Sequence, residues 1–157
     1  MEEKLVSLLK EKKLKITTVE SCTGGMIAAK IVNVSGASKV FDVGFITYAN
    51  SAKETYAGVS VITLEKFGAV SSQVAMEMAE GAAKKAFADV ALSVTGIAGP
   101  DGGTKEKPVG LVYIGVYLCG KTFFKECLFQ GDRLDIRQQS ANQAVEFVIE
   151  VVENELR

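Results

Sequence analysis

Residues 16–32, ITTVESCTGGMIAAKIV, change from one hydrophobic pattern to another within a single short segment. Ile16–Val19 is rich in β-branched residues and predicts a strand, whereas Met26–Val32 is an apolar run that is compatible with a helix. Between them, Glu20–Gly25 predicts a tight turn. This turn places a hydroxyl and a thiol side by side, where free backbone N–H groups at the positive end of the helix would meet an anion.

Outward from this segment, predicted strands and helices alternate, and a hairpin follows. Further strands are predicted at residues 43–49 and 90–94, and residues 109–118 and 122–129 predict a hairpin about Cys119-Gly120-Lys121. Helices are predicted at residues 2–14, 50–56 (capped by Asn50 or Ser51), 71–86 (capped by Ser71 or Ser72) and after a cap at Asp132, with a loop at residues 34–38. This order predicts one α/β domain over residues 1–157, a three-layer α/β/α arrangement with a mixed sheet.

The composition is that of an ordinary globular protein, with 48% hydrophobic and 24% charged residues. A net charge of −1 argues against a nucleic-acid partner, which would require a basic face. No apolar run approaches the roughly 18 residues of a membrane helix, and the charged N-terminus lacks the apolar core of a signal peptide. Cys22, Cys119 and Cys127 have no CxxC spacing, which argues against a disulfide framework and a metal site and favours a reducing cytoplasm.

The chain contains no histidine, which restricts the possible catalytic bases. A Ser-His-Asp or Cys-His arrangement cannot be assembled, so a nucleophile would need lysine, tyrosine or a carboxylate. The segment YANSAK supplies two of these groups, with Tyr48 at the end of a predicted strand and Lys53 in the first turn of the next helix. The positive helix end and partial burial would both lower the pKa of Lys53 towards the range of a base. The alternative interpretation is a packed tyrosine beside a surface lysine.

A glycine-rich segment, Thr95–Thr104, follows the strand predicted at residues 90–94. The ends of strands are where open α/β sheets bind ligands, and glycines let backbone amides approach a ligand closely. Arg133 and Arg137 lie one turn apart near another helix start and suit a phosphate, although they also fit surface ion pairs. Likewise, Ser21–Gly25 alone also fits a helix cap followed by a tight turn.

Three segments together resemble the CinA C-terminal domain family, namely Ser21–Gly25, Tyr48–Lys53 and Thr95–Pro100, and Lys107–Gly110 also matches. The resemblance runs in order along nearly the whole chain. It implies a nicotinamide-nucleotide amidohydrolase, which converts nicotinamide mononucleotide and water into nicotinic acid mononucleotide and ammonia, without a cofactor. Longer members of the family carry an additional N-terminal domain, so this chain resembles the stand-alone form.

The resemblance also implies roles for individual residues. Ser21 matches the nucleophile of the family, and Tyr48 and Lys53 match its tyrosine and lysine, so we expect Ser21 to lose its proton to Lys53, directly or through Tyr48. Cys22 is the rival nucleophile because a helix start lowers the pKa of a thiol. The residues expected to bind the substrate are Cys22, Thr23, Gly24, Gly25, Thr95, Gly96, Ala98, Gly99, Arg133 and Arg137.

Two other functions remain open from the sequence. The first is a non-catalytic module that binds pyridine nucleotides or partners another protein, in which Tyr48 and Lys53 are idle. The second is a structural interaction domain in DNA uptake or damage response. We also expect a homo-oligomer, with the Met- and Ala-rich helix at residues 71–86 packing either in the core of its own chain or between chains.

Overall fold

The computed structural model describes all residues, 1–157, and contains a five-stranded mixed sheet with helices on both faces. The strands are β1 (Ile16–Glu20), β2 (Phe41–Ile46), β3 (Val90–Gly96), β4 (Leu111–Leu118) and β5 (Lys121–Leu128), in the spatial order β2-β1-β3-β4-β5. β1 runs parallel to β2 and β3, whereas β4 runs antiparallel to β3 and β5 runs antiparallel to β4. The predicted three-layer α/β/α fold is therefore confirmed.

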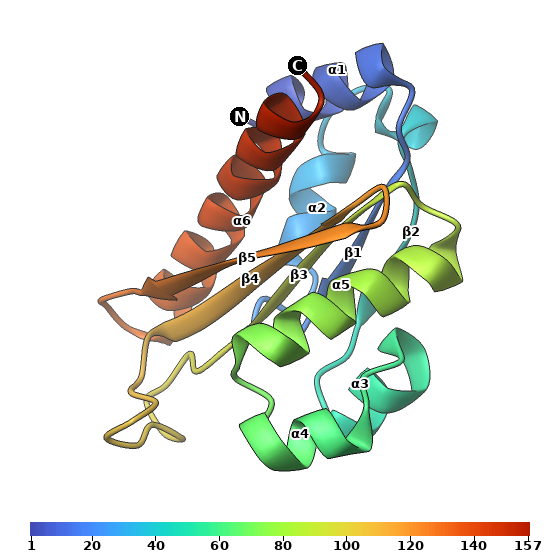
Figure 1. Cartoon of the computed structure of the whole chain (residues 1–157). Coiled ribbons are helices and arrows are strands. Elements are labelled where there is room, and N and C mark those ends of the chain that lie inside the picture. Colours follow the sequence, from blue (N-terminus) through green and yellow to red (C-terminus); the bar gives the residue numbers. More distant parts are fainter.

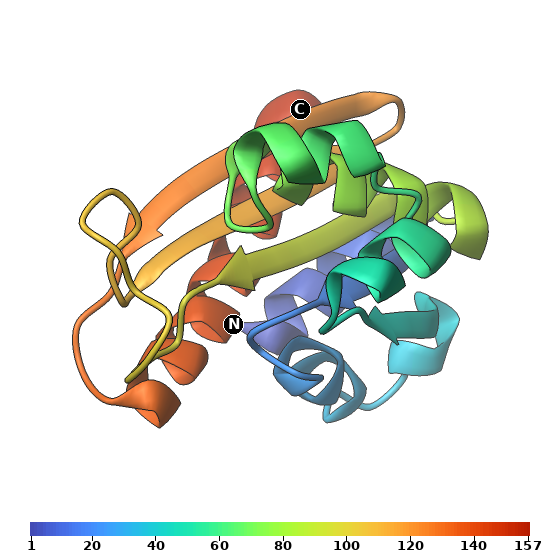
Figure 2. The same ribbon diagram turned by 90° about the horizontal axis from the view of Figure 1, so that it is seen from below.

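The helices form two groups, one on each face of the sheet (Figure 1). One group holds α1 (Glu2–Lys12), α2 (Met26–Val32) and α6 (Arg133–Glu155), and the other holds α3 (Asn50–Ala57), α4 (Val61–Phe67) and α5 (Ser72–Ala86); a short 3-10 helix, η1, spans Ala37–Lys39. Figure 2 shows the sheet between these groups, with the long loop after β3, drawn in yellow, beyond the arrowhead of that strand. None of the helices combines the length and the apolar character needed to cross a membrane.

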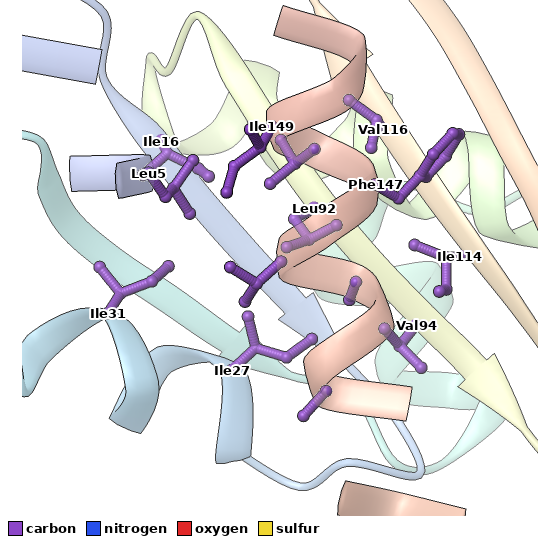
Figure 3. Close-up of a cluster of buried hydrophobic side chains, with 14 of the residues drawn as sticks. Leu5, Ile16, Ile27, Ile31, Leu92, Val94, Ile114, Val116, Phe147 and Ile149 are labelled. Carbon is purple, nitrogen blue, oxygen red and sulfur yellow. The ribbon is translucent and has the colours of Figure 1, made fainter. Parts of the chain in front are cut away.

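The larger hydrophobic core lies between the sheet and the group formed by α1, α2 and α6 (Figure 3). Ile16, Leu92 and Ile114 project from three neighbouring strands towards Ile27 of α2 and Ile149 of α6. All five residues of β1 are buried, because helices cover both faces of this interior strand. Burial of apolar surface on this scale is the main force that holds the layers together.

The second helical group packs unusually close to the sheet and to itself at two glycines. A Cβ at Gly115 of β4 would collide with the Ala75 carbonyl of α5, and one at Gly81 of α5 would overlap the carbonyl of Ala57 at the end of α3. The Ser93 hydroxyl of β3 also donates to the Ala75 carbonyl at 2.6 Å. These contacts fix α3 and α5 relative to β3, and α3 carries Lys53.

The structure confirms most expected elements and corrects several. Ser71 caps α5 by accepting from the Val74 N–H at 3.2 Å, and Asp132 caps α6 within a capping box. The expected cap of α3 was wrong: neither Asn50 nor Ser51 caps it, since Ala49 occupies the cap position without a side-chain hydrogen bond.

Element boundaries account for the other differences. β2 ends at Ile46 rather than at residue 49, α1 ends at Lys12, and part of the expected loop at residues 34–38 belongs to η1. The helix α4 was not anticipated. The buried stripe of α5 packs on the sheet of its own chain, which is one of the two arrangements expected for that helix, while the oligomeric state stays a prediction.

Candidate active site

The candidate site lies at the carboxyl ends of three neighbouring strands. Ser21 follows β1 directly, Thr47 and Tyr48 follow β2, and Thr95 and Gly96 end β3. Because β1 is parallel to both neighbours, these ends meet at one edge of the sheet, where open α/β sheets bind ligands. A cavity of about 270 Å³ opens at this edge.

The cavity brings together segments that are far apart in the sequence. It is lined by Ser21, Cys22, Tyr48, Asn50, Lys53, Ala69, Val70, Thr95, Gly96, Ile97, Ala98, Gly99, Asp101, Gly102 and Arg133. Three residues expected to be catalytic and six expected to bind substrate are therefore on its wall. Thr23, Gly24, Gly25 and Arg137, which were also expected to bind substrate, are not.

Ser21 and Lys53 are in direct contact within this cavity. The Lys53 Nζ lies 3.1 Å from the Ser21 Oγ, 2.8 Å from the Thr47 carbonyl oxygen and 3.2 Å from the Tyr48 carbonyl oxygen. The lysine is only 1% exposed, and no carboxylate forms a salt bridge with it, including that of its neighbour Glu54. Burial lowers the pKa of Lys53 from its ordinary value, because a buried ammonium loses hydration; the nearby Cys22 opposes this shift.

The three contacts of Lys53 suit a neutral amine as well as an ammonium. A neutral amine has two N–H bonds and one lone pair. The carbonyls of Thr47 and Tyr48 can only accept, so they take the two N–H bonds. The lone pair then faces the hydroxyl of Ser21, which can donate its proton to Lys53. The arrangement is chemically compatible with proton transfer from Ser21 to Lys53.

Cys22 lines the same cavity but is poorly suited to be the nucleophile. Its side chain is 6% exposed, and burial raises the pKa of the thiol to about 11. The expected effect of a helix start, which would lower this pKa, is therefore outweighed by desolvation. Since the thiolate is the reactive form, burial makes the Cys22 thiol less reactive at neutral pH than an exposed cysteine.

The Tyr48 side chain points towards an arginine rather than towards the serine–lysine pair. Tyr48 is 63% exposed, and its hydroxyl accepts a hydrogen bond from Arg133 Nη2 at 3.0 Å. No hydrogen bond joins this hydroxyl to Ser21 or Lys53, whereas the Tyr48 carbonyl accepts from Lys53. We expected the Ser21 proton to reach Lys53 either directly or through Tyr48. Only the direct route has a short contact in this structure, between the Ser21 Oγ and the Lys53 Nζ.

Arg133 joins two walls of the cavity. Besides its contact with Tyr48, its Nη1 donates to the Gly99 carbonyl at 2.7 Å, so the guanidinium connects the segment after β2 with the loop after β3. The Thr95 hydroxyl, in contrast, donates to the Ala69 carbonyl at 2.9 Å and holds the end of β3 against the segment before α5. A guanidinium has five N–H donors, so Arg133 retains some for a ligand.

The turn after β1 differs from the expectation of a helix end open to an anion. The Glu20 carboxylate accepts from the N–H groups of Ile27 and Ala28 at 2.9 and 3.1 Å, so the first turn of α2 is already capped. Arg137 lies behind the turn, where it donates to the carbonyls of Cys22 and Thr23 at 2.9 and 3.2 Å. The Cys22 N–H donates to no other residue of the protein.

Several lining residues had little or no signal in the sequence. Asn50 lies in the segment of Tyr48 and Lys53, and Asp101 lies in the glycine-rich loop, so both could have been predicted as site residues from the sequence. Ala69 and Val70 are small apolar residues whose place depends on how α4 leads into α5, and no local pattern marks them. No three cysteine, aspartate or glutamate side chains lie close enough together to hold a metal ion.

Comparisons with known proteins agree with the fold and the motifs. The sequence profile described as the CinA C-terminal domain matches residues 1–152. A CinA-like protein of Kosmotoga olearia is 57% identical over 148 residues, which are 94% of this chain but 36% of that protein. The chain thus spans little more than a third of the length of this and two other curated relatives that it matches.

Solved structures resemble the chain along almost its whole length. The competence/damage inducible protein CihA from Agrobacterium tumefaciens is 42% identical with a TM-score of 0.91, and 95% of this chain and 93% of that one are covered. A CinA superfamily protein from Enterobacter cloacae is 35% identical with a TM-score of 0.93, covering 96% of this chain and 89% of that one.

Proposed function

This chain belongs to the CinA C-terminal domain family, and on that premise we propose that it hydrolyses the carboxamide of nicotinamide mononucleotide to nicotinic acid mononucleotide and ammonia. The observation that carries the proposal is the 3.1 Å contact between the Ser21 Oγ and the Lys53 Nζ at the end of β1. A buried lysine with a lowered pKa beside a serine hydroxyl fits a nucleophile with its base. Without histidine, the chain offers no imidazole for this role.

In the first half of the reaction, the Ser21 Oγ forms a bond to the carboxamide carbon while its proton passes to the Lys53 Nζ. The electron pair of the C=O bond moves to oxygen and gives a tetrahedral oxyanion. When this intermediate collapses, the C–N bond breaks, the Lys53 ammonium returns the proton to the leaving nitrogen, and ammonia departs. Ser21 is left as an ester of the pyridine carboxylate.

In the second half, water replaces the amine. Lys53 accepts a proton from water as the water oxygen bonds to the ester carbon, and the same proton returns to the Ser21 Oγ when the C–O bond of the ester breaks. The product is the free carboxylic acid, and serine and lysine regain their starting states. The reaction as written needs no cofactor.

The Cys22 N–H is our proposed donor to the oxyanion. It belongs to the residue that follows Ser21, it donates to no other residue of the protein, and Cys22 lines the cavity. In other enzymes the loss of one such donor costs about 2.7–4 kcal/mol of transition-state stabilisation. Arg137 would act indirectly, because its contacts with the Cys22 and Thr23 carbonyls hold the peptide groups of the turn.

For the nucleotide part of the substrate, we propose that Arg133 contacts the phosphate and that Gly96, Ala98 and Gly99 lie along the ribose. Arg133 is the only arginine on the cavity wall, and a guanidinium binds phosphate through paired hydrogen bonds. Glycines on a wall allow backbone groups to reach a sugar closely. The proposed partner is thus a mononucleotide rather than a nucleic acid.

Release of ammonia from nicotinamide mononucleotide by the purified protein tests this function. The wild type and Ser35→Ala, which changes an exposed serine without recorded hydrogen bonds, should release ammonia at equal rates, and Ser21→Ala should not. If the wild type binds the nucleotide without turnover, the non-catalytic binding module is supported instead. Equal turnover by Ser21→Ala would eliminate the serine mechanism.

A further inference from the structure

Glu20 and Lys53 are the only charged side chains among the buried residues, and they lie on either side of Ser21. Lys53 belongs to the proposed catalytic pair, whereas Glu20 has no part in that chemistry. Glu20 is 0% exposed and forms no salt bridge. A buried carboxylate without a cation is costly unless hydrogen bonds satisfy it, so its contacts indicate what it is for.

Three donors satisfy the Glu20 carboxylate. The Thr23 hydroxyl donates to Oε1 at 2.6 Å, the Ile27 N–H donates to Oε1 at 2.9 Å, and the Ala28 N–H donates to Oε2 at 3.1 Å. Ile27 and Ala28 are the second and third residues of α2, whose own cap residue is Gly25 and has no side chain to offer. Glu20 therefore caps α2 from the end of β1, across the turn that carries Ser21.

This cap has two consequences for the turn. The strand end and the helix start are joined directly through the carboxylate and the Thr23 hydroxyl, while Arg137 holds the carbonyls of Cys22 and Thr23 from the other direction. The negative charge of Glu20 also occupies the positive end of α2, the place where a helix would otherwise bind an anion.

We propose that Glu20 is a positioning residue that fixes the Ser21 turn by capping α2. The catalytic part of this inference rests on the proposed function, but the capping part does not. An anion-binding measurement separates the two. Removal of the carboxylate in Glu20→Ala leaves the N–H groups of Ile27 and Ala28 without their acceptor and opens a space that formate, a free carboxylate, fits.

The experiment measures the melting temperature of four proteins with increasing formate at constant ionic strength. Formate should raise the melting temperature of Glu20→Ala by about 2–4 °C at saturation, because it binds the folded state in place of the lost carboxylate. The wild type, Glu20→Gln (whose amide fills the space) and Glu11→Ala (an exposed, unpaired control) should show no such rise. An equal response in all four proteins, or none in Glu20→Ala, would overturn the capping role.

Activity supplies the second readout. In Glu20→Ala and Glu20→Gln, kcat for the amide should fall about 10- to 100-fold, the equivalent of one hydrogen bond to a charged group, while KM stays within about twofold. Formate should restore kcat only in Glu20→Ala. If the wild type itself has no amidase activity, the proposed function fails, but the melting measurement still decides the role of Glu20.

A second pair of variants covers the case in which Glu20→Ala does not fold. Thr23→Val removes the hydroxyl that donates to Glu20 and keeps the shape of the side chain, whereas Thr23→Ser keeps the hydroxyl. The valine variant should lose kcat and the serine variant should retain most of it, with similar KM. Equal kcat in both variants would show that the bond to Glu20 does not position the turn.

Discussion

The Lys53 Nζ lies 3.1 Å from the Ser21 Oγ although 32 residues separate them, and the two side chains come from different layers of the fold. Ser21 directly follows the interior strand β1, and Lys53 belongs to α3, which packs on α5 through Gly81. The pair is therefore assembled by the packing of α3 and α5 against the sheet. Burial then removes water from the amine and lowers its pKa.

The first prediction concerns Lys53 as the base. Lys53→Met and Lys53→Arg should both lose at least about 100-fold in kcat, since methionine has no lone pair for the proton and a guanidinium stays protonated. In the wild type, kcat should rise with pH as Lys53 loses its proton, with a midpoint below 10.5, the ordinary pKa of lysine. Rates measured from pH 6 to pH 10 check this, and an unchanged profile in Lys53→Met would rule out lysine as the base.

The second prediction is a stability effect of the same burial. Between the lowered pKa of Lys53 in the folded state and the ordinary value of 10.5, the unfolded chain binds the proton and the folded chain does not. Stability therefore rises with pH across this window, because the unfolded state binds more protons. Urea unfolding at several pH values should show the free energy of unfolding of the wild type increasing towards pH 10.5 relative to that of Lys53→Met. If the free energy of unfolding changed with pH in the same way in both proteins, the lowered pKa of Lys53 would be contradicted.

The third prediction separates Cys22 from Ser21. Because burial raises the pKa of Cys22 to about 11, iodoacetamide should modify this thiol negligibly at pH 7.5 in the folded protein. Cys22→Ala should keep kcat within about threefold of the wild type, because the proposed oxyanion donor is a backbone N–H that the substitution retains. The matched variant Ser21→Ala should be inactive. An inactive Cys22→Ala with normal stability would make the thiol the nucleophile.

The fourth prediction tests Arg133 with two substrates that differ only by a phosphate. Arg133→Met should raise KM for nicotinamide mononucleotide about 10- to 100-fold, as expected for the loss of a charge-assisted hydrogen bond, and should affect nicotinamide riboside much less. Arg157→Met, a change of an exposed arginine at the C-terminus, serves as the control. If Arg133→Met raised KM equally for both substrates, Arg133 would support the cavity wall without contacting the phosphate.

The fifth prediction concerns the close packing beneath the site. Gly81→Ala should lower the free energy of unfolding by about 3 kcal/mol, because its Cβ would overlap the Ala57 carbonyl. Gly120→Ala, where nothing lies within 4 Å of the added atom, should cost only about 1 kcal/mol for its positive φ. Urea denaturation of the two variants gives the comparison. A smaller loss for Gly81→Ala than for Gly120→Ala would mean that α3 can move away.

Much of the fold and part of the candidate site could be predicted from local patterns. The β-branched residues of β1, the caps at Ser71 and Asp132 and the Cys119-Gly120 turn depend on neighbours within a few residues, and propensity acts at that range. The helix α4 was missed because it begins with three β-branched residues, Val61, Ile62 and Thr63, which favour a strand. The ends of β2 and α1 were misjudged because tertiary contacts decide whether the last residues of a strand or helix keep its conformation.

The amino-acid order alone indicated which residue types are available: a hydroxyl and a thiol after a strand, a tyrosine and a lysine after another, and no imidazole anywhere. Only the folded chain shows that Lys53 meets Ser21, that Tyr48 turns to Arg133 instead, and that Glu20 takes the helix end that looked free. The reason is physical. Local sequence governs backbone propensity over a few residues, whereas side-chain contacts and pKa shifts depend on which distant surfaces pack together and exclude water.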